Sequence, residues 1–174
     1  MELKEYRKKR DFSRTSEPKG FISEVRKHVK GIPKKNQPPH PPLLQTAKGR
    51  PLYMVHDHYS RRHHFDLRLE MNGLLRSWAI PKLIDPKNPY QRKLAVQTED
   101  HPLEYGHWQG IIPKGSYGAG KSLIWDTGTY KIIDKKKSKI VFQVKGKKLK
   151  GIFVLVSFRP KEKLWLFFKK KEKN

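Results

Sequence analysis

The residues whose types could do chemistry gather in one short stretch, HDHYSRRHHFDLRLE, at positions 56 to 70. Four histidines fall within nine positions and are followed by Asp66 and Arg68. Neutral imidazole and carboxylate offer lone pairs to a divalent cation, and an arginine fork binds phosphate oxygens. The stretch is therefore a candidate metal site beside a phosphate. A pH-sensitive surface and a basic strand that is merely rich in histidine are the alternatives.

A β-hairpin is expected to position these side chains. Polar and apolar residues alternate after position 63, as in a strand with one buried face. Asn72-Gly73 is a strong hairpin signal, because a type I′ turn needs positive φ at both central residues. Folding about this turn predicts a register in which charged residues face small ones: Asp66 with Ala79, Arg68 with Ser77, and Leu67 with Trp78. His64, Asp66 and Arg68 would then share a roomy face, although a solvated polar face is the commoner outcome of such alternation.

The rest of the chain is mostly short strands separated by turns. Further strands are predicted at 93–98, 122–125, 130–133, 140–144, 152–158 and 164–168. Many short strands with glycine turns indicate an antiparallel barrel or sandwich. We expect one domain in three regions: a basic N-terminal segment at 1–32 with helical tendency at 1–12 and 21–30, a proline-rich connector at 33–51, and a β core at 52–174.

The charge of the chain narrows the classes of partner. Lys and Arg number 40 against 16 Asp and Glu, a formal net charge of +24. Such an excess matches a polyanion, so nucleic acid is the expected partner. An anionic membrane is the rival, but the sequence holds no long apolar run and no signal-peptide core. The absence of cysteine leaves imidazole, carboxylate and water as metal ligands. A soluble, cytoplasmic protein is expected.

One motif is misleading. GSYGAGKS, at 115–122, fits the nucleotide-binding pattern GxxxxGK[ST]. That loop needs a preceding apolar strand and a following helix, which aims backbone amides at phosphate. Here a proline precedes the loop and the β-like LIWDTGTY follows it. We therefore expect a tight glycine loop without nucleotide hydrolysis.

Two long stretches carry a family resemblance. VHDHYSRRHHFDLRLEMNGLLRSWAIPK, followed by LAVQTEDHPLEYGHWQGIIPKGSYGAGKSLIWDTGTY, resembles the 3′-phosphoesterase domain of bacterial DNA ligase D and its free-standing members. YRKKRDFSRTSEP resembles the segment that opens this domain. The resemblance implies a mainly β fold, a compact antiparallel β-barrel with short flanking helices. It also implies an Mn²⁺-dependent hydrolase, with Co²⁺ or Zn²⁺ as alternative ions. Such an enzyme removes a 3′-terminal ribonucleoside and then the 3′-phosphate, leaving a 3′-hydroxyl for repair and ligation.

The resemblance also implies roles for individual residues. Its metal ligands fall on His58, His64 and Asp66. Its catalytic positions fall on Arg68, His101, Tyr105 and Lys82, and its N-terminal orienting positions on Arg10, Asp11 and Glu17. Arg68 and His101 would stabilise phosphoryl charge, His101 could protonate the leaving oxygen, and the Tyr105 hydroxyl would orient the phosphate. Asp11 and Glu17 would fix ligand histidines; alternatively, they pair with the arginine-rich segment while Tyr105 packs in a core.

Two histidines depart from the family pattern. His56 stands where the family commonly has glutamine. His63 stands where the family has an apolar residue, and it is expected to pack or to lie at the surface.

The expected partners are nucleic-acid 3′ ends, primer-template DNA with or without a terminal ribonucleotide, and a separately encoded ligase and polymerase. We expect a nucleoid-associated monomer. The alternative function is a non-catalytic basic β-barrel whose tryptophans stack bases: Trp78, Trp108, Trp125 and Trp165.

Overall fold

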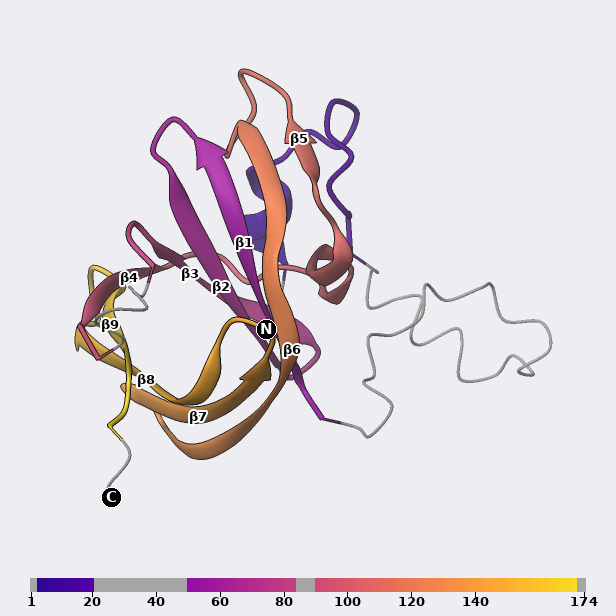
Figure 1. The fold of residues 1–174 in the computed structure, drawn as a ribbon. Helices are drawn as coiled ribbons and strands as arrows, with labels where there is room; N and C mark the ends of the chain where they lie inside the picture. The colour runs from indigo at the N-terminus through magenta and orange to yellow at the C-terminus, as the bar shows by residue number, and fades with distance from the viewer. Residues whose placement is uncertain (1–2, 21–49, 84–89, 172–174) are drawn as a thin grey trace, which may run out of the picture.

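The computed structural model describes residues 3–20, 50–83 and 90–171 (Figure 1). One short helix, α1 (Lys4–Lys8), opens the chain, and a 3-10 helix, η2 (Leu103–His107), lies between the fourth and fifth strands. The strands are β1 (Leu52–Ser60), β2 (His64–Met71), β3 (Leu74–Ile80), β4 (Lys93–Gln97), β5 (Gly110–Ile112), β6 (Gly120–Lys136), β7 (Lys139–Gly146), β8 (Lys150–Arg159) and β9 (Leu164–Lys169).

Eight of these strands close into an antiparallel barrel. Their order is β1-β2-β3-β4-β9-β8-β7-β6, and β6 pairs with β1 to complete the ring. The short strand β5 pairs with the start of β6, outside the ring. The mainly β fold with a compact barrel and little helix is therefore confirmed. Within the described residues, no helix is long and apolar enough to cross a membrane.

The predicted hairpin forms as expected. Asn72 and Gly73 adopt φ of 53° and 77°, as a type I′ turn requires. The strands β2 and β3 pair in the predicted register: Asp66 with Ala79, Arg68 with Ser77, and Leu67 with Trp78. The polar residues of β2 therefore do lie opposite small side chains.

Strand β6 departs from the prediction. The sequence suggested two short strands divided at Thr127-Gly128, whereas β6 is one strand of 17 residues. Its first part pairs with β1 and its last part with β7. Residue 128 lies inside the strand. It is a glycine because a Cβ there would lie 2.5 Å from the Lys145 carbonyl oxygen. The glycine thus marks a close approach of backbones and not a turn.

The outer face of β1, β2 and β3 is covered as well as the inner one. Leu67 and Trp78 pack inside the barrel, and Met54 and Leu75 pack outside it against Tyr6 of α1. Figure 1 shows the N-terminal segment, in indigo, beside these strands and β5. A polar side chain on this outer face is therefore enclosed between the barrel wall and the N-terminal segment.

The other expectations from the sequence have different outcomes. The base-stacking alternative fails for Trp78 and Trp165, which are 0% and 3% exposed and pack against each other in the core. The predicted N-terminal helix forms as α1. The second predicted helix at 21–30 and nearly all of the connector lie outside the described residues.

The seam between β1 and β6 is held by a buried carboxylate. Asp126 of β6 accepts hydrogen bonds from the Tyr53 hydroxyl at 2.6 Å and from the backbone N–H of Leu149 at 2.7 Å. It also accepts from the backbone N–H groups of the two preceding residues, 147 and 148, at 3.2 Å. A Cβ on Gly146 would overlap the Tyr53 hydroxyl. These contacts fix β1, the strand that carries the first histidines, against the β7–β8 turn.

Replacing Asp126 is expected to weaken the barrel. Asp126→Ala leaves buried donors without a partner and should lower the free energy of unfolding by about 3 kcal/mol, measured as a lower urea midpoint. Asp134→Ala is the control, because the Asp134 side chain is 40% exposed and only reaches Lys139 at 4.0 Å. Its effect should stay within about 0.5 kcal/mol. Equal midpoints for the two variants would contradict the role given to Asp126.

Candidate metal centre and phosphate pocket

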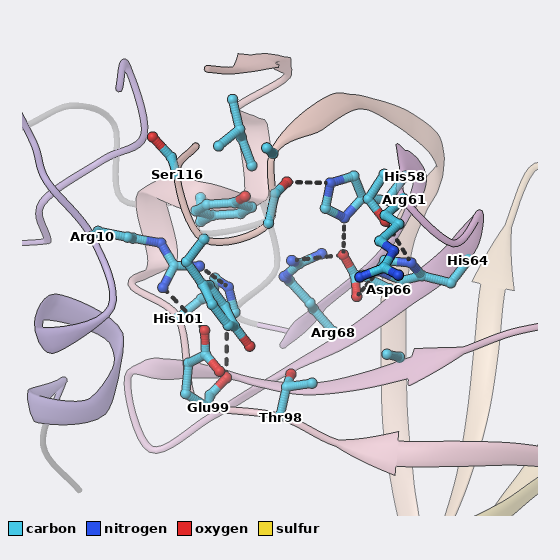
Figure 2. Close-up of a pocket in the computed structure, with 17 residues that line it drawn as sticks. Arg10, His58, Arg61, His64, Asp66, Arg68, Thr98, Glu99, His101 and Ser116 are labelled. Carbon is cyan, nitrogen blue, oxygen red and sulfur yellow. Dashed lines mark hydrogen bonds and ion pairs between the residues drawn. The ribbon is translucent and has the colours of Figure 1, made fainter. Parts of the chain in front are cut away.

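A pocket of about 480 Å³ opens on this outer face of the barrel (Figure 2). Strands β1 and β2, the N-terminal segment, the region before η2 and the loop 113–119 all contribute to it. The predicted site residues among its lining are Arg10, His58, His64, Asp66, Arg68, His101 and Tyr105. Residues that are far apart in the sequence therefore meet at one cavity.

His58 is oriented by a backbone carbonyl. Its Nε2 lies 2.9 Å from the carbonyl oxygen of Gly118, so this nitrogen carries the proton and donates it. Its Nδ1 then bears the lone pair and lies 3.5 Å from Asp66 Oδ2. Strand pairing sets His58 of β1 directly opposite His64 of β2. The fold therefore aims an imidazole lone pair at the carboxylate.

His64 is oriented in the same way by the turn before β2. Its Nδ1 lies 2.8 Å from the carbonyl oxygen of Arg62, which leaves the Nε2 lone pair 3.5 Å from Asp66 Oδ1. Burial alone would lower the pKa of His64, but the Asp66 carboxylate and the Arg62 carbonyl outweigh it and raise that pKa. In the metal-free site, a proton thus competes for the position that a cation would take.

Together these residues fit a divalent cation. Ligand atoms from His58, His64 and Asp66 all lie within 4.8 Å of one another. Burial would raise the pKa of Asp66, but Arg68 and the two histidines hold it well below its usual value, so the carboxylate is ionised. Two neutral imidazoles and one carboxylate suit ions such as Mn²⁺, Zn²⁺ or Fe²⁺, and each imidazole has the backbone partner that such ligands usually have. The predicted ligand set is thus brought together.

Arg68 lies beside these ligands and is almost fully buried. Its Nη2 donates to Asp66 Oδ2 at 3.2 Å, and its Nη1 donates to His56 Nδ1 at 2.9 Å. Its guanidinium carbon lies 4.7 Å from the centre of the Tyr105 ring. Its Nε is buried and has no hydrogen-bond partner among the described residues. A buried donor of this kind at a pocket wall is suited to an anionic oxygen.

His101 is held in a neutral form. Its Nδ1 lies 3.0 Å from the Glu99 carbonyl oxygen and its Nε2 accepts a hydrogen bond from Arg10 Nη2 at 3.2 Å. Complete burial, and then the nearby Arg68 and Arg10, lower the pKa of His101 well below its usual value. In this neutral form Nε2 faces the Arg10 guanidinium as an acceptor, and the role of His101 as proton donor to the leaving oxygen stays a prediction. His101 orients the Arg10 guanidinium.

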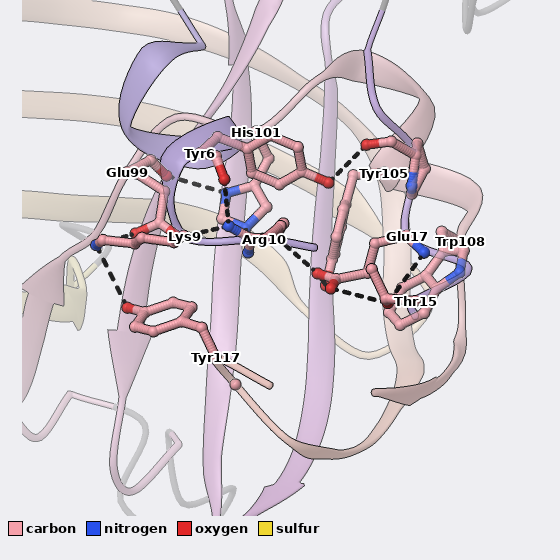
Figure 3. A network of polar contacts seen from close by, with 12 residues as sticks. Tyr6, Lys9, Arg10, Thr15, Glu17, Glu99, His101, Tyr105, Trp108 and Tyr117 are labelled. Atoms are coloured by element: carbon pink, nitrogen blue, oxygen red, sulfur yellow. Dashed lines mark hydrogen bonds and ion pairs between the residues drawn. The ribbon is translucent and has the colours of Figure 1, made fainter. Parts of the chain in front are cut away.

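A second network joins the N-terminal segment to the pocket (Figure 3). Arg10 donates from Nε to Glu17 at 2.9 Å and from Nη1 to Glu99 at 3.0 Å. The Tyr105 hydroxyl donates to the same Glu17 carboxylate at 3.1 Å. Glu17 was expected either to fix a ligand histidine or to pair with the arginine-rich segment; it pairs with Arg10 of that segment and accepts a hydrogen bond from Tyr105. Tyr105 was expected to orient phosphate by its hydroxyl, which is instead used within this network.

Two predicted residues do not join the site. Asp11 is exposed and accepts hydrogen bonds from the backbone N–H and hydroxyl of Ser13, so it closes a local turn. Lys82 is exposed two residues beyond the end of β3 and does not line the pocket. His63 lies at the surface, as expected, where it stacks on Tyr59.

The sequence analysis assigned no role to two buried residues of the site, His56 and Glu99. His56 is 0% exposed, its Nε2 donates to the Trp108 carbonyl, and burial followed by the charge of Arg68 lowers its pKa to about 3. The sequence feature that could have identified His56 is its spacing of two residues from His58, which places both side chains on one face of a strand. Glu99 pairs with Arg10 and Lys9 at 3.0 Å. No local pattern marks Glu99 apart from its nearness to His101.

The loop 113–119 differs from a nucleotide-binding loop, as expected. It joins the antiparallel strands β5 and β6, and no helix follows it. Gly115 and Gly118 adopt φ of 86° and 75°. The glycines serve to turn the chain tightly so that the Gly118 carbonyl meets His58.

Comparisons with known proteins show the family of the chain. A model of the DNA Ligase D 3′-phosphoesterase domain matches residues 56–157. The multifunctional non-homologous end joining protein LigD of Pseudomonas aeruginosa is 38% identical to the chain over 179 residues, covering 98% of the chain and 19% of that protein. The proteins of the same name from Mycobacterium bovis and Mycolicibacterium smegmatis are 37% and 35% identical, covering 88% and 99% of the chain.

The chain spans about a fifth of the length of these curated relatives. The match nevertheless includes the metal ligands, Arg68, His101 and Tyr105, all of which lie within residues 56–157. The match of this family model over residues 56–157 and the identity to these relatives show that the chain belongs to the DNA ligase D 3′-phosphoesterase domain family.

Proposed function

We propose that the protein is a metal-dependent phosphoesterase that processes 3′ ends of DNA and of RNA-terminated DNA. It removes a 3′-terminal ribonucleoside by phosphodiester cleavage and then the 3′-phosphate, which leaves a 3′-hydroxyl. The observation that carries this proposal is the convergence of two imidazole lone pairs and a carboxylate beside the buried, partly unpaired guanidinium of Arg68. Mn²⁺ is the proposed ion, and a ligase and a polymerase are the proposed partners.

Some residues of the site bind the cation or stabilise charge on the phosphoryl group, and others hold these residues in position. When bound at His58, His64 and Asp66, the cation supplies Lewis-acid polarisation of the phosphoryl group and a water of lowered pKa. Arg68 lines the pocket, and its guanidinium binds a phosphoryl oxygen and stabilises the charge that grows there. Arg10, at the pocket wall, adds a second guanidinium that Glu17, Glu99 and His101 hold in place.

A purely binding role accounts less well for the same geometry. A surface that only attracts phosphate gains nothing from buried carboxylates, yet Asp66, Glu99 and Glu17 are 7%, 8% and 4% exposed at or beside the pocket. Two of the four tryptophans that were to stack bases lie in the core. The ionised Asp66 has a clear purpose only as a ligand or an anchor of Arg68.

Activity is tested on a primer-template that ends in one 3′-ribonucleotide. With Mn²⁺, the wild type should convert this end to a 3′-phosphate and then to a 3′-hydroxyl, and EDTA should stop both steps. His64→Ala should lower the rate at least about 100-fold, because it removes a ligand of the cation. His63→Ala is the matched control and should keep wild-type rates. If the wild type binds the duplex but changes no 3′ end with any divalent ion, the protein is a binder.

Metal binding can be measured without turnover. Calorimetric titration of the wild type should show one Mn²⁺ site, and His64→Ala should weaken it at least about 100-fold while His63→Ala leaves it unchanged. His63 is the adjacent histidine but lies at the surface against Asp57. Equal affinity of the two variants would mean that His64 is not a ligand.

The affinity for Mn²⁺ should depend on pH in a defined direction. The pKa of His64 in the metal-free site is raised above its usual 6.5, and only the neutral imidazole binds a cation. Affinity should therefore begin to fall at a higher pH than an ordinary histidine would cause, and it should drop by about tenfold for each pH unit below the raised pKa. The same titration at pH 8, 7 and 6 measures this. An affinity that is constant over this range would show that no histidine proton is displaced.

A further inference from the structure

Tyr117 is an exposed aromatic residue that the reaction chemistry described above does not use. It lines the pocket and is 49% exposed, on the loop 113–119 between β5 and β6. Lys9 Nζ lies 4.8 Å and the Arg10 guanidinium carbon 5.7 Å from the centre of its ring. Figure 3 shows the Tyr117 hydroxyl directed toward Lys9, 3.5 Å away. A large aromatic surface thus stands at the open side of a polar cavity.

The loop that carries Tyr117 is anchored to the metal centre. Gly118, the next residue, accepts the hydrogen bond from His58 Nε2 at 2.9 Å. The Lys114 carbonyl accepts from Arg14 at 3.3 Å, and two backbone turns, from Pro113 to Ser116 and from Ser116 to Ala119, close the loop on itself. The position of the ring is therefore set relative to the ligands of the cation and not by a free surface loop.

Two tyrosines that are equally exposed differ in their surroundings. Tyr59 is 50% exposed, but it already stacks on His63 with ring centres 4.6 Å apart, and it does not line the pocket. Within the described ranges, no aromatic ring stacks on Tyr117. Lys9 and Arg10 lie over its ring, but 49% of Tyr117 stays exposed, and this part of its surface is available to a ligand that occupies the cavity.

We propose that Tyr117 is the stacking platform for the base of the 3′-terminal nucleoside that the protein removes. The inference rests on the proposed function. Hydrolysis adds water to phosphorus and breaks its bond to the O5′ of the terminal nucleoside, which leaves with a proton on O5′. With the phosphorus between the metal ligands and Arg68, the nucleoside must occupy another part of the pocket, and the half-exposed Tyr117 lines that same pocket. Base stacking on an aromatic ring is strong and tolerates any base, as removal of an arbitrary nucleoside requires.

Kinetics on the two successive substrates test this role, because only the first carries a terminal nucleoside. Tyr117→Ala should lower kcat/KM on a 3′-ribonucleoside end by about 5- to 100-fold. On a 3′-phosphate end the same variant should stay within about twofold of the wild type, because no stacking energy is involved. Tyr117→Phe should restore the first activity, since it keeps the ring and loses only the hydroxyl near Lys9. Tyr59→Ala is the matched control and should change neither step. Equal losses on both substrates, or no loss on the first, would overturn the inference.

A binding measurement separates this inference from the proposed hydrolysis. In EDTA, fluorescence anisotropy compares a primer-template that ends in a ribonucleotide with one that ends in an abasic ribose. The wild type should bind the end with a base about 5- to 100-fold more tightly, and Tyr117→Ala should abolish the difference. If hydrolysis is absent but this preference depends on Tyr117, the stacking role stands and the proposed reaction fails. A preference that survives in Tyr117→Ala, or that the wild type lacks, would refute the stacking role.

Discussion

Asp66 places an ionised carboxylate, 7% exposed, between two imidazoles and a guanidinium. A buried charge is tolerated only where it is paired and hydrogen-bonded, so the side chains around it are constrained in number and in orientation. Arg68 meets this constraint by donating a hydrogen bond to Asp66. The ring nitrogens of His58 and His64 that face Asp66 meet it either by donating a proton to the carboxylate or by sharing a cation with it, and their other nitrogens face backbone carbonyls. The hairpin register matters for the same reason, because Ala79 opposite Asp66 leaves the volume in which these groups converge.

The N-terminal segment completes the charge balance of the pocket. Arg68 and Arg10 bring two guanidiniums into one cavity, which without carboxylates would repel each other at low dielectric. Glu17 and Glu99, which lie 7 and 89 residues from Arg10 in sequence, bind it from two sides. The neutral His101 can lie beside Arg10 because burial keeps it uncharged. The chain is thus strongly basic in total, yet its pocket is an alternation of cations and anions that holds each cation in a fixed position.

The sequence predicted what depends on local pattern and missed what depends on burial. Asn72-Gly73 fixed the β2–β3 register, and with it the shared face of His64, Asp66 and Arg68. The approach of His58 to His64 needs the pairing of β1 with β2, which no turn signal between them specifies. The neutral state of His101 arises from burial beside two arginines from distant segments, so an ordinary histidine pKa did not indicate it. Gly128 looked like a turn because close backbone approach and chain reversal both select glycine.

The glycine loop shows how one hydrogen bond can serve two parts of a site. The bond from His58 Nε2 to the Gly118 carbonyl selects the tautomer that presents the Nδ1 lone pair to Asp66. The same bond fixes the backbone one residue after Tyr117, and therefore the pocket wall that the tyrosine forms. A side chain at Gly118 would have to adopt φ of 75°, which most residues disfavour. A motif that resembles a phosphate-binding loop in sequence thus acts through its carbonyl, as the acceptor that couples ligand orientation to the shape of the cavity.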